Sequence, residues 1–195
     1  MVLYPQLPQD NIADGPLDVT EVKVARAYVD FGAIRIINRS DVHLRAEVEE
    51  ATGTVVAVTV GLRDSNVQLQ AFAAPKSEGL WFEVREQLKA NFVSQGIKYE
   101  ERLGAFGYEL IANLHGPGVA PGGQLARFVG VDGPRWFLRG IFTGPGATEP
   151  VSASEMDDVF RGVIINRGDT PIPPRDLLPL SVPESAMQAN RDFLG

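Results

Sequence analysis

The alternation of hydrophobic and polar residues predicts strands in the first third of the chain. Residues 43–49 alternate between apolar side chains and a polar set that includes His43, Arg45 and Glu47. Comparable strand patterns occupy residues 29–36, 54–62 and 67–73. In the last of these, Gln68 and Gln70 lie opposite the apolar positions. Strands with one polar face are typical of an antiparallel sheet.

The spacing of apolar residues then changes from two to nearly four, which predicts a helix. Its apolar stripe is formed by Leu80, Trp81, Val84, Leu88 and Phe92. Charged and amide side chains fill the other positions, as in an amphipathic helix on a protein surface. Gly96 supplies a C-terminal stop, because glycine tolerates the left-handed conformation in which many helices end.

The second half of the chain repeats this order of strands followed by a helix. Residues 97–101 and 108–115 predict strands, and residues 126–140 predict a hairpin. A second helix begins near Ser152, where Ser152 and Glu155 fit a capping box. Arg167 and Gly168 are typical of the end of that helix. The chain after Pro171 is rich in proline.

Runs of strands, rather than alternating strands and helices, predict an α+β fold. We expect a largely antiparallel twisted sheet of about seven to eight strands, two main helices and a proline-rich C-terminal tail. Residues 17–180 form a single domain in this interpretation. Residues 1–16 form an extended N-terminal arm, and residues 181–195 form a tail with a short helix over 184–194. The order of elements resembles that of PsbP-like α/β/α sandwiches.

Composition narrows the classes of partner and compartment. The chain has 195 residues, no cysteine and a formal net charge of −7. An acidic protein repels the phosphate backbone, so nucleic-acid binding is not expected. The absence of cysteine excludes disulfides and thiolate metal sites and suits a reducing cytoplasm. Neither a membrane-spanning run nor a signal peptide is predicted, and we therefore expect a cytoplasmic protein.

The common catalytic motifs are missing from the sequence. His43 and His115 are the two histidines, and no metal-binding spacing joins them. No serine lies in a nucleophile elbow, and the glycine-rich segments 116–123 and 144–146 lack the remaining residues of a phosphate-binding loop. The adjacent carboxylates on strands diverge, and those of the second helix suit its N-terminal half. We therefore predict no catalytic residue, no metal and no cofactor.

The hairpin of residues 126–140 holds the remaining candidate chemistry. If Asp132 and Gly133 form a two-residue turn, Val129 faces Trp136 and Phe128 faces Phe137. One face of the hairpin then carries the core side chains Val129, Val131, Trp136, Leu138 and Phe142, interrupted by Arg127. The other face carries Phe128, Arg135, Phe137 and Arg139.

Two interpretations of this second face remain open. The arginines and aromatic rings could bind a small anionic or planar ligand, or a protein partner. Alternatively, the second helix could cover Phe128 and Phe137, while Arg135 and Arg139 pair with its carboxylates, Glu155, Asp157 and Asp158. The structural interpretation is favoured, because buried aromatic residues usually belong to a core.

Several segments also resemble a known family. The matching pieces include residues 15–18, 29–35, 69–76, 79–81, 159–162, 167–169 and 174–180, and the best match is the hairpin segment 127–140. On these residues the chain resembles the actinobacterial domain of unknown function 3710 (DUF3710) family. The resemblance implies a cytoplasmic protein without an assigned activity and transfers no catalytic residue. The chain departs from the family at Leu17, where members commonly have tryptophan.

The sequence favours a non-enzymatic module for protein interaction, or an accessory module, that could also self-associate. The alternative is a protein or enzyme that binds a small anionic ligand through Arg135, Arg139, Phe128 and Phe137. Neither a membrane nor nucleic acid is an expected partner.

Overall fold

A seven-stranded sheet forms the centre of the computed structural model, which describes residues 15–23 and 26–184. Its strand order is β4-β5-β6-β10-β9-β8-β7, and every neighbouring pair is antiparallel. The strands are β4 (His43–Glu49), β5 (Thr54–Leu62), β6 (Ser65–Ala73), β7 (Tyr99–Gly104), β8 (Gly107–Leu114), β9 (Gln124–Gly133) and β10 (Trp136–Thr143). The predicted α+β class with a largely antiparallel sheet is confirmed.

A second, smaller sheet was not predicted. Its order is β1 (Leu17–Asp18), β11 (Ile164–Ile165), β3 (Ile34–Ile37) and β2 (Tyr28–Asp30). The single strand expected over residues 29–36 is two strands, because the chain turns at Gly32, where φ is 88°. β1 and β11 are parallel and two residues long, which is too short for an alternating pattern to reveal.

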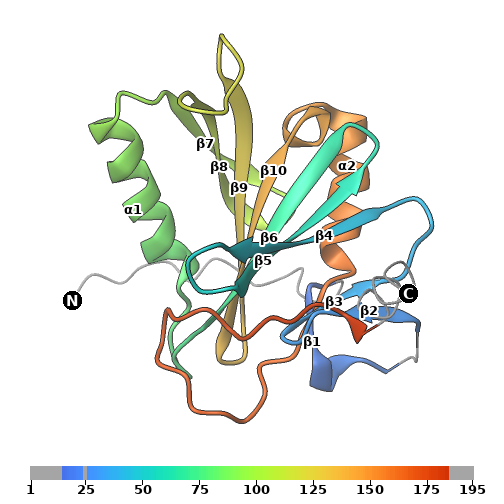
Figure 1. Ribbon diagram of the computed structural model, residues 1–195. Helices are drawn as coiled ribbons and strands as arrows, with labels where there is room; N and C mark the ends of the chain where they lie inside the picture. The colour runs from blue at the N-terminus through green and yellow to red at the C-terminus, as the bar shows by residue number, and fades with distance from the viewer. Residues whose placement is uncertain (1–14, 24–25, 185–195) are drawn as a thin grey trace.

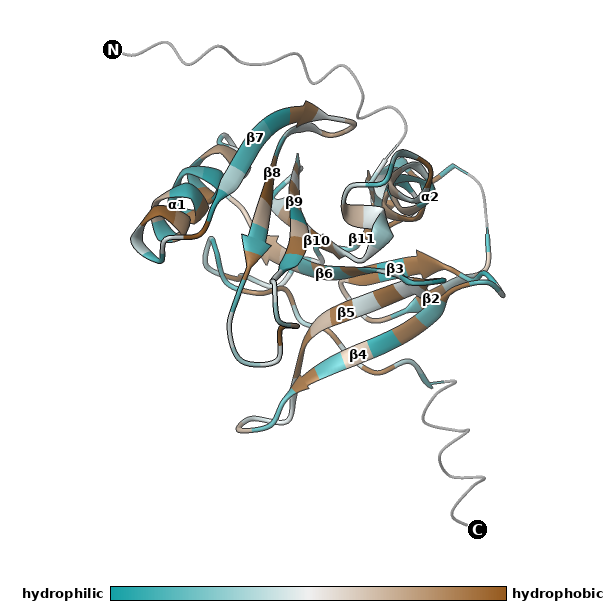
Figure 2. Ribbon diagram, turned by 90° about the horizontal axis from the view of Figure 1, so that it is seen from above, coloured by the Kyte–Doolittle hydropathy of each residue, from teal (hydrophilic) through white to brown (hydrophobic). Residues whose placement is uncertain are grey.

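The helices lie on opposite faces of the seven-stranded sheet (Figures 1 and 2). α1 (Trp81–Ser94) packs on one face, called here the α1 face. α2 (Pro150–Arg161) and the small sheet pack on the other, the α2 face. The sheet therefore divides the hydrophobic core into two clusters. Within the described residues, no helix combines the length and the apolar character that a membrane crossing requires.

α1 matches the predicted helix, and its N-terminus is held by a distant residue. The N-cap position, Leu80, makes no side-chain capping bond. Asp132 of β9 supplies the cap in place of a local side chain. The Asp132 carboxylate accepts hydrogen bonds from the Leu80 amide at 2.7 Å and the Trp81 amide at 3.2 Å. Negative charge is favoured there by the helix dipole. Gly96 has a φ of 67°, as the predicted helix stop requires.

α2 begins earlier than predicted, at Pro150, and the predicted end at Arg167 and Gly168 is wrong, because the helix ends at Arg161. Proline is favoured in the first turn, because its missing N–H would have no partner there. The capping box proposed for Ser152 and Glu155 is wrong, since both residues lie inside the helix. A capping box does occur in the short 3-10 helix η2 (Val19–Glu21), where Asp18 and Glu21 satisfy each other's backbone amides.

Two strand glycines allow the helices to approach the sheet closely. A Cβ atom at Gly130 would overlap the ring of Trp81 on α1. A Cβ atom at Gly140 would lie 2.8 Å from the ring of Phe160 on α2. Glycine within a strand often marks such a close approach. A second short 3-10 helix, η3 (Pro145–Ala147), precedes α2.

The segment 175–181 joins the two sheets across one end of the molecule, drawn in orange and red in Figure 1. The Leu178 amide donates to the Ala71 carbonyl of β6 at 2.8 Å. The Ser181 amide donates to the Phe31 carbonyl, beside the small sheet, at 2.9 Å. The Leu178 side chain is buried in the core. The N-terminal arm through residue 14 and the terminal helix from residue 185 onward lie outside the described residues.

Candidate functional site

The hairpin register differs from the prediction, although its two faces do not. The loop residues are Pro134 and Arg135, so that Trp136 pairs with Gly133 and Phe128 with Ile141. Proline at the second position and a φ of 64° at Arg135 suit a type II turn. Phe128 was expected to pair with Phe137 and pairs with Ile141 instead, which is a shift of four residues and therefore even. Each side chain therefore keeps its face.

Phe128 and Phe137 belong to the core. Phe128 is 5% and Phe137 is 1% exposed, and both pack in the cluster beneath α1. The helix that covers them is thus α1, not the second helix as one interpretation proposed. Arg135 lies exposed in the turn. It is four residues from Arg139, about 13 Å along an extended strand, so the two arginines do not converge.

The carboxylates expected to pair with these arginines have other partners. Glu155 pairs with Arg63, Asp157 with Arg127, and Asp158 with Arg161. Neither Arg135 nor Arg139 forms an ion pair with any residue in the described ranges 15–23 and 26–184.

Arg139 lies on the α1 face beside the aromatic core. One guanidinium nitrogen donates a short hydrogen bond to the Gln70 amide oxygen. The guanidinium carbon lies 5.5 Å from the centre of the Phe72 ring. Its Nε is buried without an acceptor among the described residues. Burial lowers the pKa of Arg139 below the usual arginine value, because the charged form loses hydration.

A row of aromatic rings connects α1 to Arg139. Trp81 stacks on Phe137 with centres 6.0 Å apart, and Phe137 stacks on Phe72 at 5.8 Å. The guanidinium of Arg139 lies over the Phe72 ring. This row of rings marks the edge of the apolar part of the α1 face, and the side chains beyond it are mainly polar.

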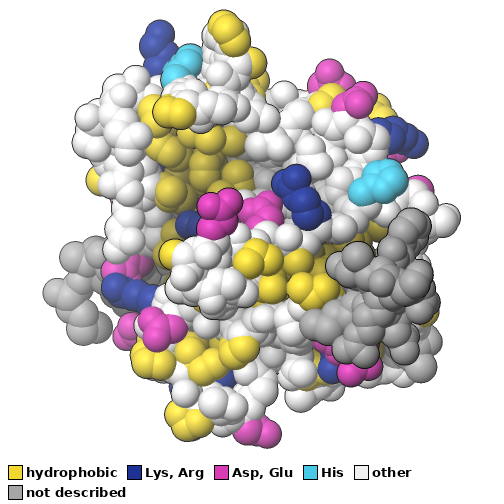
Figure 3. Space-filling model, viewed as in Figure 1, with side chains coloured by type: hydrophobic (Ala, Val, Ile, Leu, Met, Phe, Trp, Pro, Cys, Tyr) yellow, Lys and Arg dark blue, Asp and Glu magenta, His cyan; other side chains and the backbone are white. Residues whose placement is uncertain are grey.

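A polar groove of about 480 Å³ continues from this point across the same face. Its lining comes from β4, β5, β6 and β10: His43, Leu44, Arg45, Glu47, Thr59, Gly61, Asn66, Gln68, Ile141 and Thr143. Figure 3 shows charged side chains of both signs across the middle of this face, below hydrophobic side chains beside α1. The pair Gln70–Arg139 lies two residue pairs along the strands from Gln68–Ile141, so the two are adjacent pairs on the same face.

Hydrogen bonds order the groove. Glu47 accepts from the Thr59 hydroxyl and, at 2.5 Å, from the Gln68 amide. Gln70 donates to the Val56 carbonyl at 3.3 Å and accepts from Arg139. Alternation in the sequence had placed Gln68 and Gln70 on the polar side of their strand. It could not show that this strand lies beside β10 and therefore beside Arg139.

Arg127, which interrupts the core face of the hairpin, is satisfied by buried carboxylates. Its guanidinium lies 2.8 Å from Asp157 of α2 and 3.3 Å from Glu109 of β8. It also donates to the Gly146 carbonyl at 3.1 Å, and Arg102 pairs with Glu109 at 2.8 Å. Burial raises the pKa of Asp157, and Arg127 opposes that rise. We interpret this network as structural, since Arg127 and Glu109 are closed off from solvent.

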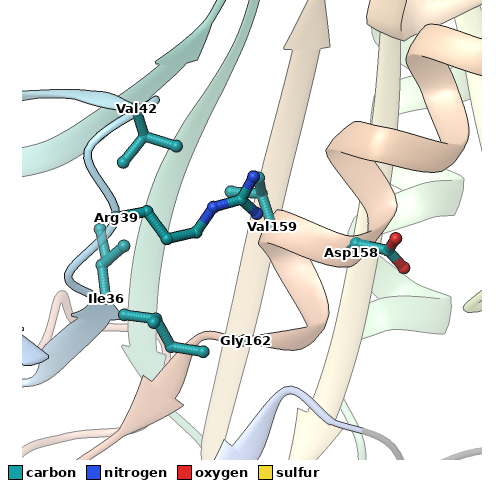
Figure 4. A pocket seen from close by; sticks show the side chains of 7 residues that line it. Ile36, Arg39, Val42, Asp158, Val159 and Gly162 are labelled. Carbon is teal, nitrogen blue, oxygen red and sulfur yellow. The ribbon is translucent and has the colours of Figure 1, made fainter. Parts of the chain in front are cut away.

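A second cavity, of about 20 Å³, lies between α2 and the small sheet (Figure 4). It is lined mainly by Ile36, Val42 and Val159, with Arg39 and Asp158 beside it. This volume accommodates about one water molecule, which is too little for a substrate. Arg39 pairs with Asp41 at 2.6 Å.

The described residues contain no group of three or more side chains suited to hold a metal ion. His43 and His115 are both exposed, and His43 is part of the groove lining.

Comparisons with known proteins address the fold and the family. The solution structure of cyanobacterial PsbP (CyanoP) from Synechocystis sp. PCC 6803 is similar with 16% identity and a TM-score of 0.39. The match covers 69% of this chain and 87% of that one. No curated protein matches the chain. The model of the family described as "Protein of unknown function (DUF3710)" matches residues 15–189, and the chain therefore belongs to the DUF3710 family.

Proposed function

We propose that this protein is a non-enzymatic binding module that docks a protein partner on the open part of the α1 face. The observation that supports this most directly is the unequal covering of the sheet. Among the described residues, α1 packs over strands β8, β9 and β10, whereas neither helix contributes to the groove, whose lining comes from β4, β5, β6 and the end of β10. Side chains of four strands thus form a broad surface of mixed charge, as at many non-obligate interfaces.

Hydrogen bonds within the groove also support its role as a docking surface. Each carboxylate oxygen of Glu47 accepts a hydrogen bond, one from Thr59 and one from Gln68. Glu47 thereby holds these groove side chains in position, which lowers the entropic cost of docking a partner.

Site-specific photo-crosslinking tests this proposal. A benzophenone amino acid at Asn66, an exposed groove residue, should form one defined adduct in cells. The same group at Val151, which is 74% exposed on α2, is the control and should not form that adduct. With the purified partner, Gln68→Arg should raise Kd about tenfold or more, as expected for disruption near the centre of an interface.

Two outcomes contradict the proposal. One is identical adducts from Asn66 and Val151; the other is an unchanged Kd for Gln68→Arg.

A second candidate function, the binding of a small anionic ligand, is favoured by Arg139 alone among the four predicted residues. Its support is a desolvated guanidinium that has no carboxylate partner within the described part of the chain.

We also propose a cytoplasmic location, supported by the absence of cysteine from the 195 residues. Cell fractionation tests it, and recovery in a secreted or membrane fraction contradicts it.

A further inference from the structure

Two arginines on neighbouring strands have opposite electrostatic environments. Arg127, on the α2 face, has two carboxylates and a carbonyl as partners. Arg139, on the α1 face, has one neutral amide and one aromatic ring. The Nε atoms of both arginines are buried without an acceptor among the described residues, so the difference between them is the missing carboxylate. Arg139 is therefore a partly buried positive charge without a carboxylate partner in the described part of the chain.

Such a charge reduces stability, because removing a cation from water costs more than one neutral hydrogen bond returns. Residues that break the rule of paired buried charges occur mainly at functional sites. Gln70 and Phe72 also fix the plane of the guanidinium before any ligand arrives. This preorganisation suits the recognition of a planar anion by the arginine fork.

The surroundings of Arg139 select the class of anion. It contributes a single positive charge, its neighbours Gln68 and Gln70 on β6 are neutral, and the groove cation Arg45 already pairs with Glu47 at 3.7 Å. A carboxylate balances the single charge of the Arg139 guanidinium, whereas a doubly charged phosphate would keep one negative charge without a partner. The partly buried side chains of Phe72 and Ile141 flank Arg139 on this face and offer apolar contact to a carbon skeleton.

We propose that Arg139 is a carboxylate-binding point at the edge of the groove, with Gln70 and Phe72 positioning it and Ile141 contacting the acid's carbon skeleton. The proposal rests on this face being a binding surface. It nevertheless concerns a small acid that can be tested without any partner protein. The carboxylate could belong to a free acid or to an acidic side chain of the partner, and the experiment separates the two.

The test measures the thermal unfolding midpoint with sodium benzoate, acetate, phosphate and chloride at equal ionic strength. Benzoate should raise the midpoint of the wild type in a saturable manner, because a ligand that binds the folded state stabilises it. Acetate should act more weakly. Phosphate should give only the non-saturable rise of an excluded salt, and that rise should persist in Arg139→Met. Arg139→Met should abolish the benzoate shift and leave the unliganded midpoint unchanged or higher.

Matched variants make the result specific. Arg45→Met removes another groove arginine, one that pairs with Glu47 at 3.7 Å, and should keep the benzoate shift. Arg139→Lys keeps the charge and removes the fork, so we expect roughly tenfold weaker half-saturation. If Arg139→Met fails to fold, the lysine variant decides the question.

Three results overturn the proposal: no saturable benzoate shift in the wild type, a saturable phosphate shift that depends on Arg139, or a half-saturation concentration for benzoate that is unchanged in Arg139→Lys or in folded Arg139→Met. Competition then identifies the source of the carboxylate. Benzoate added before irradiation should reduce the Asn66 adduct if the partner supplies an acidic side chain to Arg139, and leave its yield unchanged if the natural ligand is a free acid. Failure of the crosslinking experiment leaves the benzoate result intact, so the two proposals fail separately.

Discussion

At the scale of single residues, Asp132 shows how one side chain acquires a role from a distant element. Its carboxylate lies at the end of β9 and accepts the free amides at the start of α1. Burial raises the pKa of Asp132, and the hydrogen bonds from Leu80 and Trp81 only partly offset this. The capping interaction and the cost of burying the charge therefore act against each other at the same atom.

We predict that Asp132→Asn changes the pH dependence of stability. The pKa of Asp132 is higher in the folded state than its ordinary value of 3.8, so the folded state binds more protons between these two values. Wild-type stability therefore falls as pH rises through this window and becomes level above it. Asparagine keeps an acceptor for the helix and cannot ionise.

Urea unfolding between pH 3 and pH 7 checks this prediction, with the difference between wild type and Asp132→Asn as the measured quantity. As pH rises, the free energy of unfolding of the wild type should fall relative to that of Asp132→Asn. Burial also raises the pKa of Asp157. Because Asp157 is present in both proteins, its contribution to the pH dependence cancels in the difference. A difference that is constant with pH refutes the prediction.

At the scale of elements, the packing of α1 on the sheet depends on a glycine opposite its first aromatic residue. The Trp81 ring occupies the space that a side chain at Gly130 would need. Trp81 also donates its indole N–H to the Tyr108 carbonyl at 2.8 Å, which ties α1 to β8. The start of α1 is thus fixed by β8 and β9 together with Asp132.

Gly130→Ala should destabilise the protein by about 1–3 kcal/mol, the usual cost of overpacking a core. Chemical denaturation of the single variants and of the pair with Trp81→Ala gives a double-mutant cycle. Truncation of Trp81 removes the closest overlap with the new methyl group and leaves the one with Phe137 at 2.7 Å, so the combined cost should be smaller than the sum. Simple additivity would show that Gly130 does not accommodate Trp81.

At the scale of the whole molecule, the two sheets are joined by packing and by the segment 175–181. β5 and β6 are paired from Val58 and Leu69 to the turn that joins them, and the rest of the two strands is not paired with each other. Beyond that point, Leu177 bridges Phe72 and Leu180 bridges Val55, so the segment fills the space where the strands separate. The two sheets consequently should unfold together.

Leu178→Ala should lower the free energy of unfolding by about 2–5 kcal/mol, because it leaves a cavity in the core. Leu177→Ala is the matched control. Its side chain is 37% exposed, and the expected change is within about 0.5 kcal/mol. Denaturation should stay a single transition in both variants when followed by circular dichroism and fluorescence. Separate transitions would contradict the coupling of the sheets.

The sequence by itself determined which side chains share a face. Alternation placed Arg139 with Phe137 and Trp136 with Leu138, and the helical period defined the stripe of α1 from Leu80 to Phe92. These assignments survived the wrong turn, because an even shift of register preserves the faces. Local periodicity reports the direction of a side chain, and that direction depends only on the backbone conformation nearby.

Only the tertiary structure decided what each face meets. α1 rather than α2 covers Phe128 and Phe137, Asp132 caps a helix rather than forming a turn, and Arg127 finds Asp157 and Glu109. Arg139 lies beside Gln70 and Phe72 because β6 and β10 are neighbours. Such partners are separated by tens of residues, and their contacts follow from strand order and helix placement, which no local period encodes.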